Sequence, residues 1–297
     1  MAAHFEFEAI GTTWKIDVPG PMSVDQERDL LVAIRDRIAV FDKAYSRFRS
    51  DSLVSEIARR AGEYVMPDDA LPMMSLYQEL YHVTGGLMTP LVGQVLADAG
   101  YDATYTLKPK PAIAKAPAWE EIMSYDHPIL TIKQPVLLDF GAVGKGYLID
   151  IISRIIREHG FQSYTVDAGG DIAHRNAIGK TLRVGLEDPA DPKKIVGVAD
   201  IGDRSICGSA GNRRVWDRFH HIIDPKKVES PRHILGLWTV ADTTIVADAL
   251  STALFFVSPE ALVEKLDGRH PFECAILYAD RTAYTSKNFP GGLYVIK

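Results

Sequence analysis

Apolar and polar side chains alternate along the first 18 residues, on both sides of a short break. The segment "HFEFEAIGTTWKIDV" (4–18) carries this pattern, and the break falls at Ile10 and Gly11. Alternation with a period of two places every second side chain on one face of an extended chain. The pattern predicts either two paired strands or one interrupted strand.

A 3.6-residue period follows, which is typical of amphipathic helices. In the long helix predicted over 23–46, Ser23 and Gln26 have the spacing of a capping box. Its apolar face is formed by Leu30, Leu31, Ile34, Ile38, Phe41 and Tyr45. Shorter helices are predicted over 51–60 and 71–86, the second ended by its two glycines.

The stretch 106–119 is rich in Pro, Lys and Ala, which predicts a surface excursion within one domain. From residue 128 onward the pattern changes to strands, interrupted by a helix over 145–159 with an isoleucine-rich face. Further strands are predicted over 128–139, 163–172, 181–189, 197–210, 233–240, 274–280 and 281–287. Helices are predicted over 247–257 and 258–266, the second capped by Ser258 and Pro259.

Grouped helices and grouped strands predict an α+β fold, with a mixed or largely antiparallel sheet flanked by helices. The 297 residues are 46% hydrophobic, which is enough for a large core, and we expect a single domain over 1–297. No internal repeat of 20–50 residues is present.

The net charge of −6 argues against a general affinity for nucleic acid, because neutralising phosphates needs a basic surface. No run approaches the roughly 18 apolar residues of a membrane span. Two cysteines in a chain of this length are no disulfide framework, and the sequence leaves open whether Cys207 and Cys274 pair.

The segment "LLDFGAVGKGYLID" (137–150) resembles a phosphate-binding loop but lacks the spacing of a Walker A motif. We expect a strand to end at Asp139 and a helix to begin near Gly144. A helix N-terminus offers free N–H groups to an anion, and Lys145 adds a charge at the same place. The alternative is a plain strand-to-helix turn with a solvated lysine.

Three further segments carry candidate chemistry. The adjacent glycines of "VDAGGDI" (166–172) lie inside a predicted strand, where a β-bulge is the simplest explanation. In "HHIIDP" (220–225) the two histidines cannot face the same way on a strand, so one of them can point into a cleft. Asp248 and Thr252 share a helical face and offer oxygen ligands suited to Mg²⁺, although a capping Asp and a buried Thr would give the same pattern.

Taken together and in this order, these segments resemble the ApbE family of FAD:protein FMN transferases. Members carry segments like "YSRFRSDSLVSEI", "LDFGAVGKGYLID", "DAGGDI", "SAGNRRVWDRFHHIIDP" and "VADALSTALFFV" of this chain. The resemblance runs from about Gly11 to the C-terminal strands. It implies an ApbE-like fold, related to the T-fold, and a Mg²⁺-dependent reaction that cleaves FAD, releases AMP and attaches FMN to a Ser or Thr of an acceptor flavoprotein.

The resemblance also implies roles for individual residues. His221 would be the base that accepts the proton of the acceptor hydroxyl, with Asp224 as the next candidate. The metal ligands would be the carbonyl of Ala142 and the side chains of Asp248 and Thr252, with Ser251 at a position where some members have a second Asp. Contacts to FAD would come from Ile10, Phe48, Leu87, Met88, Thr89, Asp139, Lys145 and Ile223.

This sequence differs from the family pattern at Ile10, where Met is usual, and at Thr89, where many members have an acidic residue. Family members are often exported or lipid-anchored, whereas the beginning of this sequence shows no basic segment followed by an apolar one, so we expect a cytoplasmic protein. Alternatives to the transferase are a pyrophosphatase that converts FAD to FMN and AMP, a non-catalytic FAD-binding protein, and a phosphate-binding fold without flavin.

Overall fold

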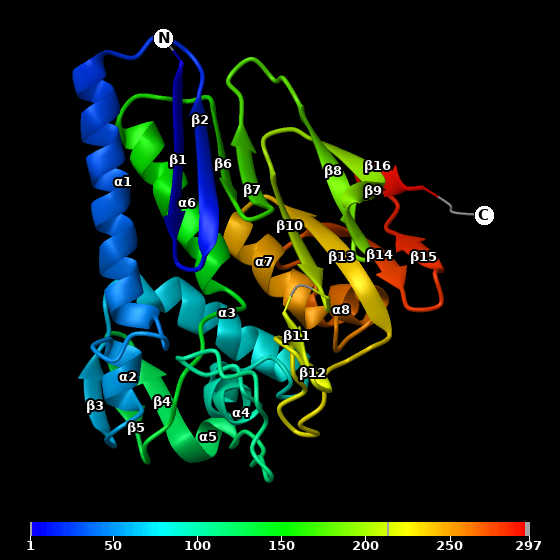
Figure 1. The fold of residues 1–297 in the computed structure, drawn as a ribbon. Coiled ribbons are helices and arrows are strands. Elements are labelled where there is room, and N and C mark those ends of the chain that lie inside the picture. The colour runs from blue at the N-terminus through cyan, green and yellow to red at the C-terminus, as the bar shows by residue number, and fades with distance from the viewer. Residues whose placement is uncertain (1, 213, 295–297) are drawn as a thin grey trace.

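The computed structural model describes residues 2–212 and 214–294, and an eight-stranded sheet is its main element (Figure 1). The strand order is β1-β2-β6-β7-β10-β13-β14-β15, and each neighbouring pair is antiparallel. The strands are β1 (Ala3–Ala9), β2 (Thr12–Val18), β6 (Tyr164–Ala168), β7 (Asp171–Arg175), β10 (Ser205–Ala210), β13 (Ile234–Ala241), β14 (Phe272–Tyr278) and β15 (Ala283–Thr285).

Helices cover one face of this sheet, and a smaller sheet covers the other. The helices α1 (Val24–Tyr45), α6 (Gly144–Glu158) and α7 (Thr244–Ala253) belong to the largest hydrophobic core. The smaller sheet has the order β16-β9-β8 and consists of β8 (Leu182–Asp188), β9 (Asp191–Ile201) and β16 (Gly291–Leu293).

Strand β14 shows how the sequence separates these two layers. Cys274 and Ile276 belong to the helical core, whereas Ala275 and Leu277 pack in the core beneath the smaller sheet. This is the two-residue period of a strand that is buried on both faces.

A lower part of the molecule lies below the ends of these strands and contains a second three-stranded sheet (Figure 1). Its elements are α2 (Leu53–Ile57), β3 (Gly62–Val65), α3 (Ala70–Val83), η1 (Pro90–Val92), α4 (Gly93–Asp98), α5 (Trp119–Ile122), β4 (Met123–Asp126) and β5 (Ile129–Ile132). Two elements from the second half of the chain complete the set, the hairpin of β11 (Val215–Trp216) and β12 (Phe219–His220) and the helix α8 (Pro259–Leu266).

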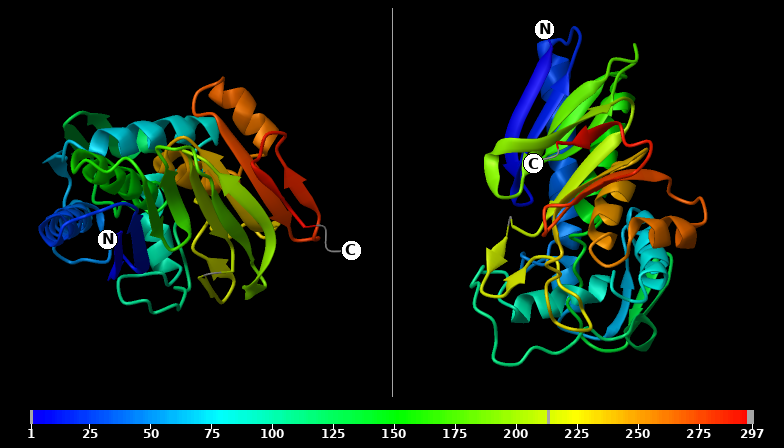
Figure 2. Two further views of the ribbon diagram at one scale, coloured as in Figure 1. Left: turned by 90° about the horizontal axis from the view of Figure 1, so that it is seen from above. Right: turned by 90° about the vertical axis from the view of Figure 1, so that its right-hand side faces the viewer.

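The predicted excursion lies over this hairpin region, as the right-hand view of Figure 2 shows. The indole N–H of Trp216 donates to the carbonyl of Ala99 at 2.6 Å, and the N–H of Ala116 donates to the carbonyl of Pro225 at 2.9 Å. Residues 106–118 form no helix or strand, as predicted.

The predicted α+β class is confirmed, and several local predictions hold. Ser23 and Gln26 form the capping box of α1, and Ser258 caps α8. The first strand pattern is a hairpin, with Ile10 at φ 43° and Gly11 at φ 75° in its turn.

Two local predictions were wrong. Gly169 and Gly170 do not form a bulge within a strand but are the turn between β6 and β7, where both have positive φ. The strand before the "GAVGKG" loop ends at Ile132 rather than at Asp139, and residues 135–140 run without strand pairing. Val136, Leu138 and Phe140 of this run are buried in the core, which periodicity alone does not distinguish from a strand.

Within the described residues, no helix combines the length and apolar character needed to cross a bilayer. Cys207 and Cys274 are both buried and unpaired. They lie on β10 and β14, which are separated by β13, so each faces Thr239 across its own strand pair.

Candidate active site

A cavity of about 610 Å³ opens where the large sheet meets the lower part of the molecule. Its walls come from the β1–β2 turn, the end of α1, the loop before α6, the end of β10 and α7. The cavity wall includes all but two of the predicted site residues, namely Ile10, Phe48, Leu87, Met88, Thr89, Asp139, Ala142, Lys145, His221, Ile223, Asp248 and Thr252. The folded chain therefore brings together residues that are separated by up to 242 positions in the sequence (252 − 10).

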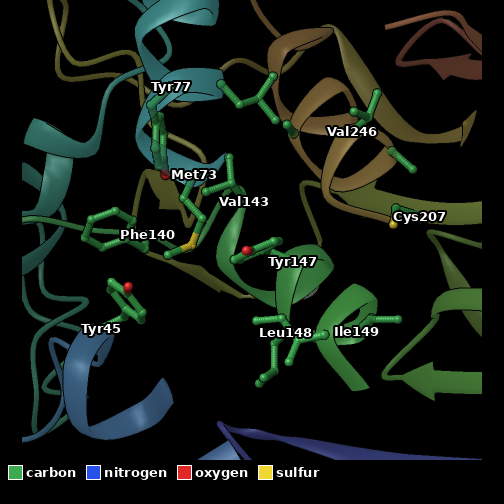
Figure 3. Packing of buried hydrophobic residues seen from close by; sticks show 14 of the residues in the cluster. Tyr45, Met73, Tyr77, Phe140, Val143, Tyr147, Leu148, Ile149, Cys207 and Val246 are labelled. Carbon is green, nitrogen blue, oxygen red and sulfur yellow. The ribbon is translucent and has the colours of Figure 1, made fainter. Parts of the chain in front are cut away.

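The loop before α6 is fixed from below by aromatic packing. Phe140 lies between the rings of Tyr45 and Tyr77, at centroid distances of 5.2 and 6.0 Å (Figure 3). The hydroxyl of Tyr77 donates to the carbonyl of Asp139 at 3.0 Å. This buried anchor holds the side chain of Asp139 at the cavity wall.

The carboxylate of Asp139 is held by two donors. The N–H of Gly141 donates to its Oδ1 at 2.7 Å, and Nε of Arg47 donates to its Oδ2 at 2.5 Å. The guanidinium of Arg47 is also stacked between aromatic rings, 4.2 Å from the centroid of Phe48 and 4.7 Å from that of Tyr101. Arg47 is therefore a buried structural cation of the cavity wall.

Gly146, the second glycine of "GKG", allows α6 and α7 to approach closely. A Cβ atom on Gly146 would lie 2.4 Å from the carbonyl oxygen of Thr244 and 2.6 Å from Cβ of Asp248. Because glycine has no Cβ, α7 can come close enough for the N–H of Gly146 to donate to Oδ2 of Asp248 at 2.8 Å. The carboxylate of Asp150 accepts the N–H groups of Thr244 and Ile245 at 2.9 and 2.8 Å, so α6 also caps the beginning of α7.

Lys145 and two carboxylates form a charged cluster at the cavity floor. Nζ of Lys145 lies 2.5 Å from Oδ2 of Asp171, whose Oδ1 accepts the N–H of Gly208 at 3.2 Å. Burial acts to lower the pKa of Lys145, but the charges of Asp171 and Asp248 outweigh it and raise that pKa. Lys145 is therefore a cation at neutral pH whose charge is already shared with Asp171.

Asp248 is the carboxylate of this cluster whose negative charge is only partly offset by its neighbours. Burial raises its pKa well above the ordinary value and the charge of Asp171 raises it further, whereas Lys145 and the N–H of Gly146 act to lower it. A buried carboxylate in this state is stabilised by an additional cation.

The oxygen atoms near Asp248 suit a hard cation. Thr252 follows one helical turn later on α7, and Ala142 belongs to the wall of the same cavity. A carboxylate, a hydroxyl and a backbone carbonyl are an all-oxygen donor set, which Mg²⁺ prefers. Across residues 2–212 and 214–294, no three His, Cys, Asp or Glu side chains gather into a metal-binding group.

Ser251 and Asp224 are the two predicted residues that lie outside the described wall of the cavity. The hydroxyl of Ser251 is fully buried, donates to the carbonyl of Asp248 and lies 2.7 Å from Oγ of Ser209. Asp224 is buried, and its Oδ1 accepts the N–H groups of Lys226 and Lys227 in a turn. Both side chains stabilise local backbone in this structure.

The two adjacent histidines face different surroundings, as predicted. His221 belongs to the cavity wall, whereas His220 is buried on the other side of the chain. Nε2 of His220 lies 2.8 Å from the carbonyl of Pro231, and its Nδ1 accepts the N–H of Ile222 at 3.2 Å. This pattern assigns the proton to Nε2 and makes His220 a structural residue.

The family model for the ApbE family matches residues 10–276. This chain belongs to the ApbE family. It is 23% identical over 280 residues to the FAD:protein FMN transferase of Escherichia coli K12, covering 87% of this chain and 79% of that protein. It is 26% identical over 285 residues to the FAD:protein FMN transferase of Salmonella typhimurium, covering 89% and 81%.

The fold agrees with solved ApbE structures. The flavin transferase ApbE from Vibrio cholerae superposes with a TM-score of 0.79 at 21% identity, covering 97% of this chain and 98% of that one. At this identity the likeness establishes the fold, and it confirms the ApbE-like architecture predicted from the sequence.

Sequence reasoning missed two charged residues of the cavity wall, Arg47 and Arg214, and Asp171, which pairs with the wall residue Lys145. No role was assigned to Arg47 from the sequence, yet this residue is 5% exposed. Asp171 follows the two glycines of "AGGDI" and is 1% exposed, and Arg214 donates to the hydroxyl of Tyr101 at 2.5 Å. The order "GGD" was a usable signal for Asp171, because a turn of two glycines leaves the next side chain at the beginning of a strand.

Proposed function

We propose that this chain is a Mg²⁺-dependent FAD:protein FMN transferase. It cleaves FAD, attaches FMN to a Ser or Thr hydroxyl of an acceptor flavoprotein domain, and releases AMP. The observation that carries the proposal is the meeting of Asp139, Lys145, His221 and Asp248 around one cavity in a member of a family whose relatives bear that name.

Asp248, Thr252 and the carbonyl of Ala142 would hold the Mg²⁺ ion. The metal would supply positive charge to the pyrophosphate, where charge develops during phosphoryl transfer. The raised pKa of Asp248 supports this assignment, because a bound cation offsets the cost of ionising a buried carboxylate.

Residues of the chain bind the phosphates, orient the substrate and accept the proton. Lys145 pairs with a phosphate oxygen of FAD, and Asp139 is held rigid by Arg47 to orient the substrate. His221 takes the proton from the acceptor hydroxyl, whose oxygen then bonds to the phosphorus of the FMN half. The bond from that phosphorus to the bridging oxygen breaks, and AMP leaves with this oxygen and its electron pair.

Co-expression with candidate flavoprotein domains, followed by mass spectrometry of those domains, tests the proposal. The expected result is an added FMN mass on a Ser or Thr, with one AMP released per flavin attached. A matched reaction in EDTA should give neither product.

The other outcomes identify the alternatives. Free FMN and AMP, formed at the same rate with and without the acceptor, would identify a pyrophosphatase. FAD that stays bound and intact in Mg²⁺ would identify a binding protein. Either result would contradict the transferase.

A further inference from the structure

A second cavity, of about 320 Å³, lies next to the first and shares a wall with it. The shared wall is formed by residues within 208–212 and 214–223. Ala210 and His221 belong to the first cavity, whereas their sequence neighbours Gly211 and His220 belong to the second. Adjacent side chains along an extended segment point to opposite sides, so this segment separates the two cavities.

The second cavity is mainly apolar. Its walls include Val215, Phe219, Ile234 and Leu235. Both ring nitrogens of His220 are occupied by backbone partners, so this residue presents the faces and edges of its ring rather than a free polar group. A mainly apolar cavity of this size has room for one large apolar side chain.

Positive charge surrounds the opening of the second cavity. Arg232 is exposed, and Arg281 is half exposed, with its nearest carboxylate, that of Asp188, at 3.9 Å. Both arginines belong to the lining of this cavity, in a chain whose net charge is −6. A partner surface that carries carboxylates would therefore meet this region favourably, although most of the protein would repel it.

The second cavity also lies beside the candidate base. The ring centroids of His220 and His221 are 6.1 Å apart. A chain that fills the second cavity with one side chain can therefore place another side chain, a few residues away, at His221. Val215, which is 56% exposed, lies at the edge that such a chain would cross.

We propose that the second cavity is a docking site for the acceptor protein. A segment of the acceptor inserts an apolar side chain there, sets its carboxylates against Arg232 and Arg281, and thereby brings its Ser or Thr to His221. This inference rests on the proposed transferase function. It adds that the acceptor segment carries an apolar anchoring side chain and acidic residues close to the target hydroxyl.

The test uses a library of 12-residue peptides with a fixed central Thr and randomised flanks, selected on the FAD-loaded protein without Mg²⁺. The expected result is enrichment of a large apolar residue at a constant distance from the Thr, together with Asp or Glu. The enriched peptide is then labelled, and its dissociation constant is measured by fluorescence anisotropy.

Two matched variants locate the binding site. Ala190 is exposed in the turn between β8 and β9 and belongs to the second cavity, so Ala190→Trp would fill it. Ala61 is also exposed and lies outside both cavities as described, so Ala61→Trp is the control. Ala190→Trp should weaken peptide binding about tenfold or more, the equivalent of losing the burial of one large apolar side chain, and both variants should bind FAD like the wild type.

Absence of an apolar and acidic preference, or equal peptide binding by the wild type and Ala190→Trp, would overturn the docking site. Because binding is measured without Mg²⁺, it is independent of the reaction. Peptides that bind as expected but receive no FMN when Mg²⁺ is added would support the docking site and contradict the transferase. Transfer of FMN with an unchanged KM in Ala190→Trp would support the transferase and contradict the docking site.

Discussion

The ammonium nitrogen of Lys145 lies 2.5 Å from Oδ2 of Asp171, at the point where the beginnings of α6 and β7 meet. Asp171 is 1% exposed, so this carboxylate has no access to solvent as an alternative partner. Lys145 therefore serves the fold as well as the ligand. Its charge stabilises Asp171 and Asp248 before any phosphate binds, and a phosphate has to share the ammonium with them.

The first prediction concerns this double role. Lys145→Met should weaken FAD binding by roughly 1.5–3 kcal/mol, the range for a hydrogen bond to a charged group, and should also lower the free energy of unfolding because Asp171 loses its counter-charge. The double variant Lys145→Met/Asp171→Asn should recover stability but not FAD affinity. Calorimetric titration and urea denaturation measure the two effects. Riboflavin, which has no phosphate, is the control ligand, and an equal loss of its binding would mean that the site has misfolded.

The second prediction concerns Asp248. Asp248→Asn keeps the shape of the side chain and an acceptor for the N–H of Gly146, but removes the charge. It should abolish Mg²⁺-dependent turnover and leave the metal-free protein at least as stable as the wild type, because ionising this buried carboxylate beside Asp171 is costly. The exposed Asp242 provides the control variant Asp242→Asn. Wild-type turnover of Asp248→Asn in Mg²⁺ would remove Asp248 from the site.

The sequence predicted the elements of this fold well wherever one period dominated. The hairpin at Ile10, the long helix capped by Ser23 and the helix that carries Asp248 all follow from local patterns. The run 136–140 was mistaken for a strand because it is apolar, whereas its burial comes from the aromatic packing around Phe140. Only the tertiary structure brings Tyr45 and Tyr77 to that ring.

The site shows the same limit. The positions of Lys145, His221 and Asp248 were predicted because the order of several motifs resembles one family. Arg47 was missed because an arginine in a polar segment between two helices is usually solvated. Its burial depends on Tyr101 and Asp139, which are 54 and 92 residues away, and no local pattern connects such positions.

The third prediction concerns Arg47. Arg47→Met keeps the apolar body of the side chain but leaves Asp139 without its cation, and losing one partner of a buried ion pair costs about 3–5 kcal/mol. Arg49→Met is a matched control two residues away, because Arg49 pairs with Asp42 and Asp51 at the surface, where ion pairs contribute little to stability. Urea denaturation of both variants measures the difference. Equal and small losses would show that Asp139 is held adequately without Arg47.

The fourth prediction concerns pH. Burial lowers the pKa of His220, and the nearby charge of Arg232 lowers it further, while the bond to the carbonyl of Pro231 acts in the opposite direction. A lowered pKa in the folded state means that the neutral ring contributes stability above the unfolded-state pKa of about 6.5, and that this contribution is lost as the pH falls below it. The stability advantage of the wild type over His220→Asn should therefore shrink between pH 7.5 and 5.5. Denaturation curves at both pH values measure it, and a constant advantage would contradict the assignment.

The last prediction concerns His221. A Ser or Thr hydroxyl is a poor nucleophile until a base takes its proton, and a positioned base typically contributes about 10²–10⁴-fold. An imidazole suits this task near neutral pH, and His221 is the histidine of the pair that belongs to the cavity wall. His221→Ala should bind FAD and Mg²⁺ nearly normally and transfer FMN more slowly by that factor. His220→Asn should lose stability and bind the acceptor more weakly, but at saturating acceptor and below its unfolding temperature it should transfer FMN close to the wild-type rate. Single-turnover transfer with both variants separates the two rings. If only His220→Asn is slow, the base is the ring of His220. If neither variant is slow, Asp224 becomes the next residue to replace, and Asp224→Asn would keep the turn through its remaining carbonyl oxygen.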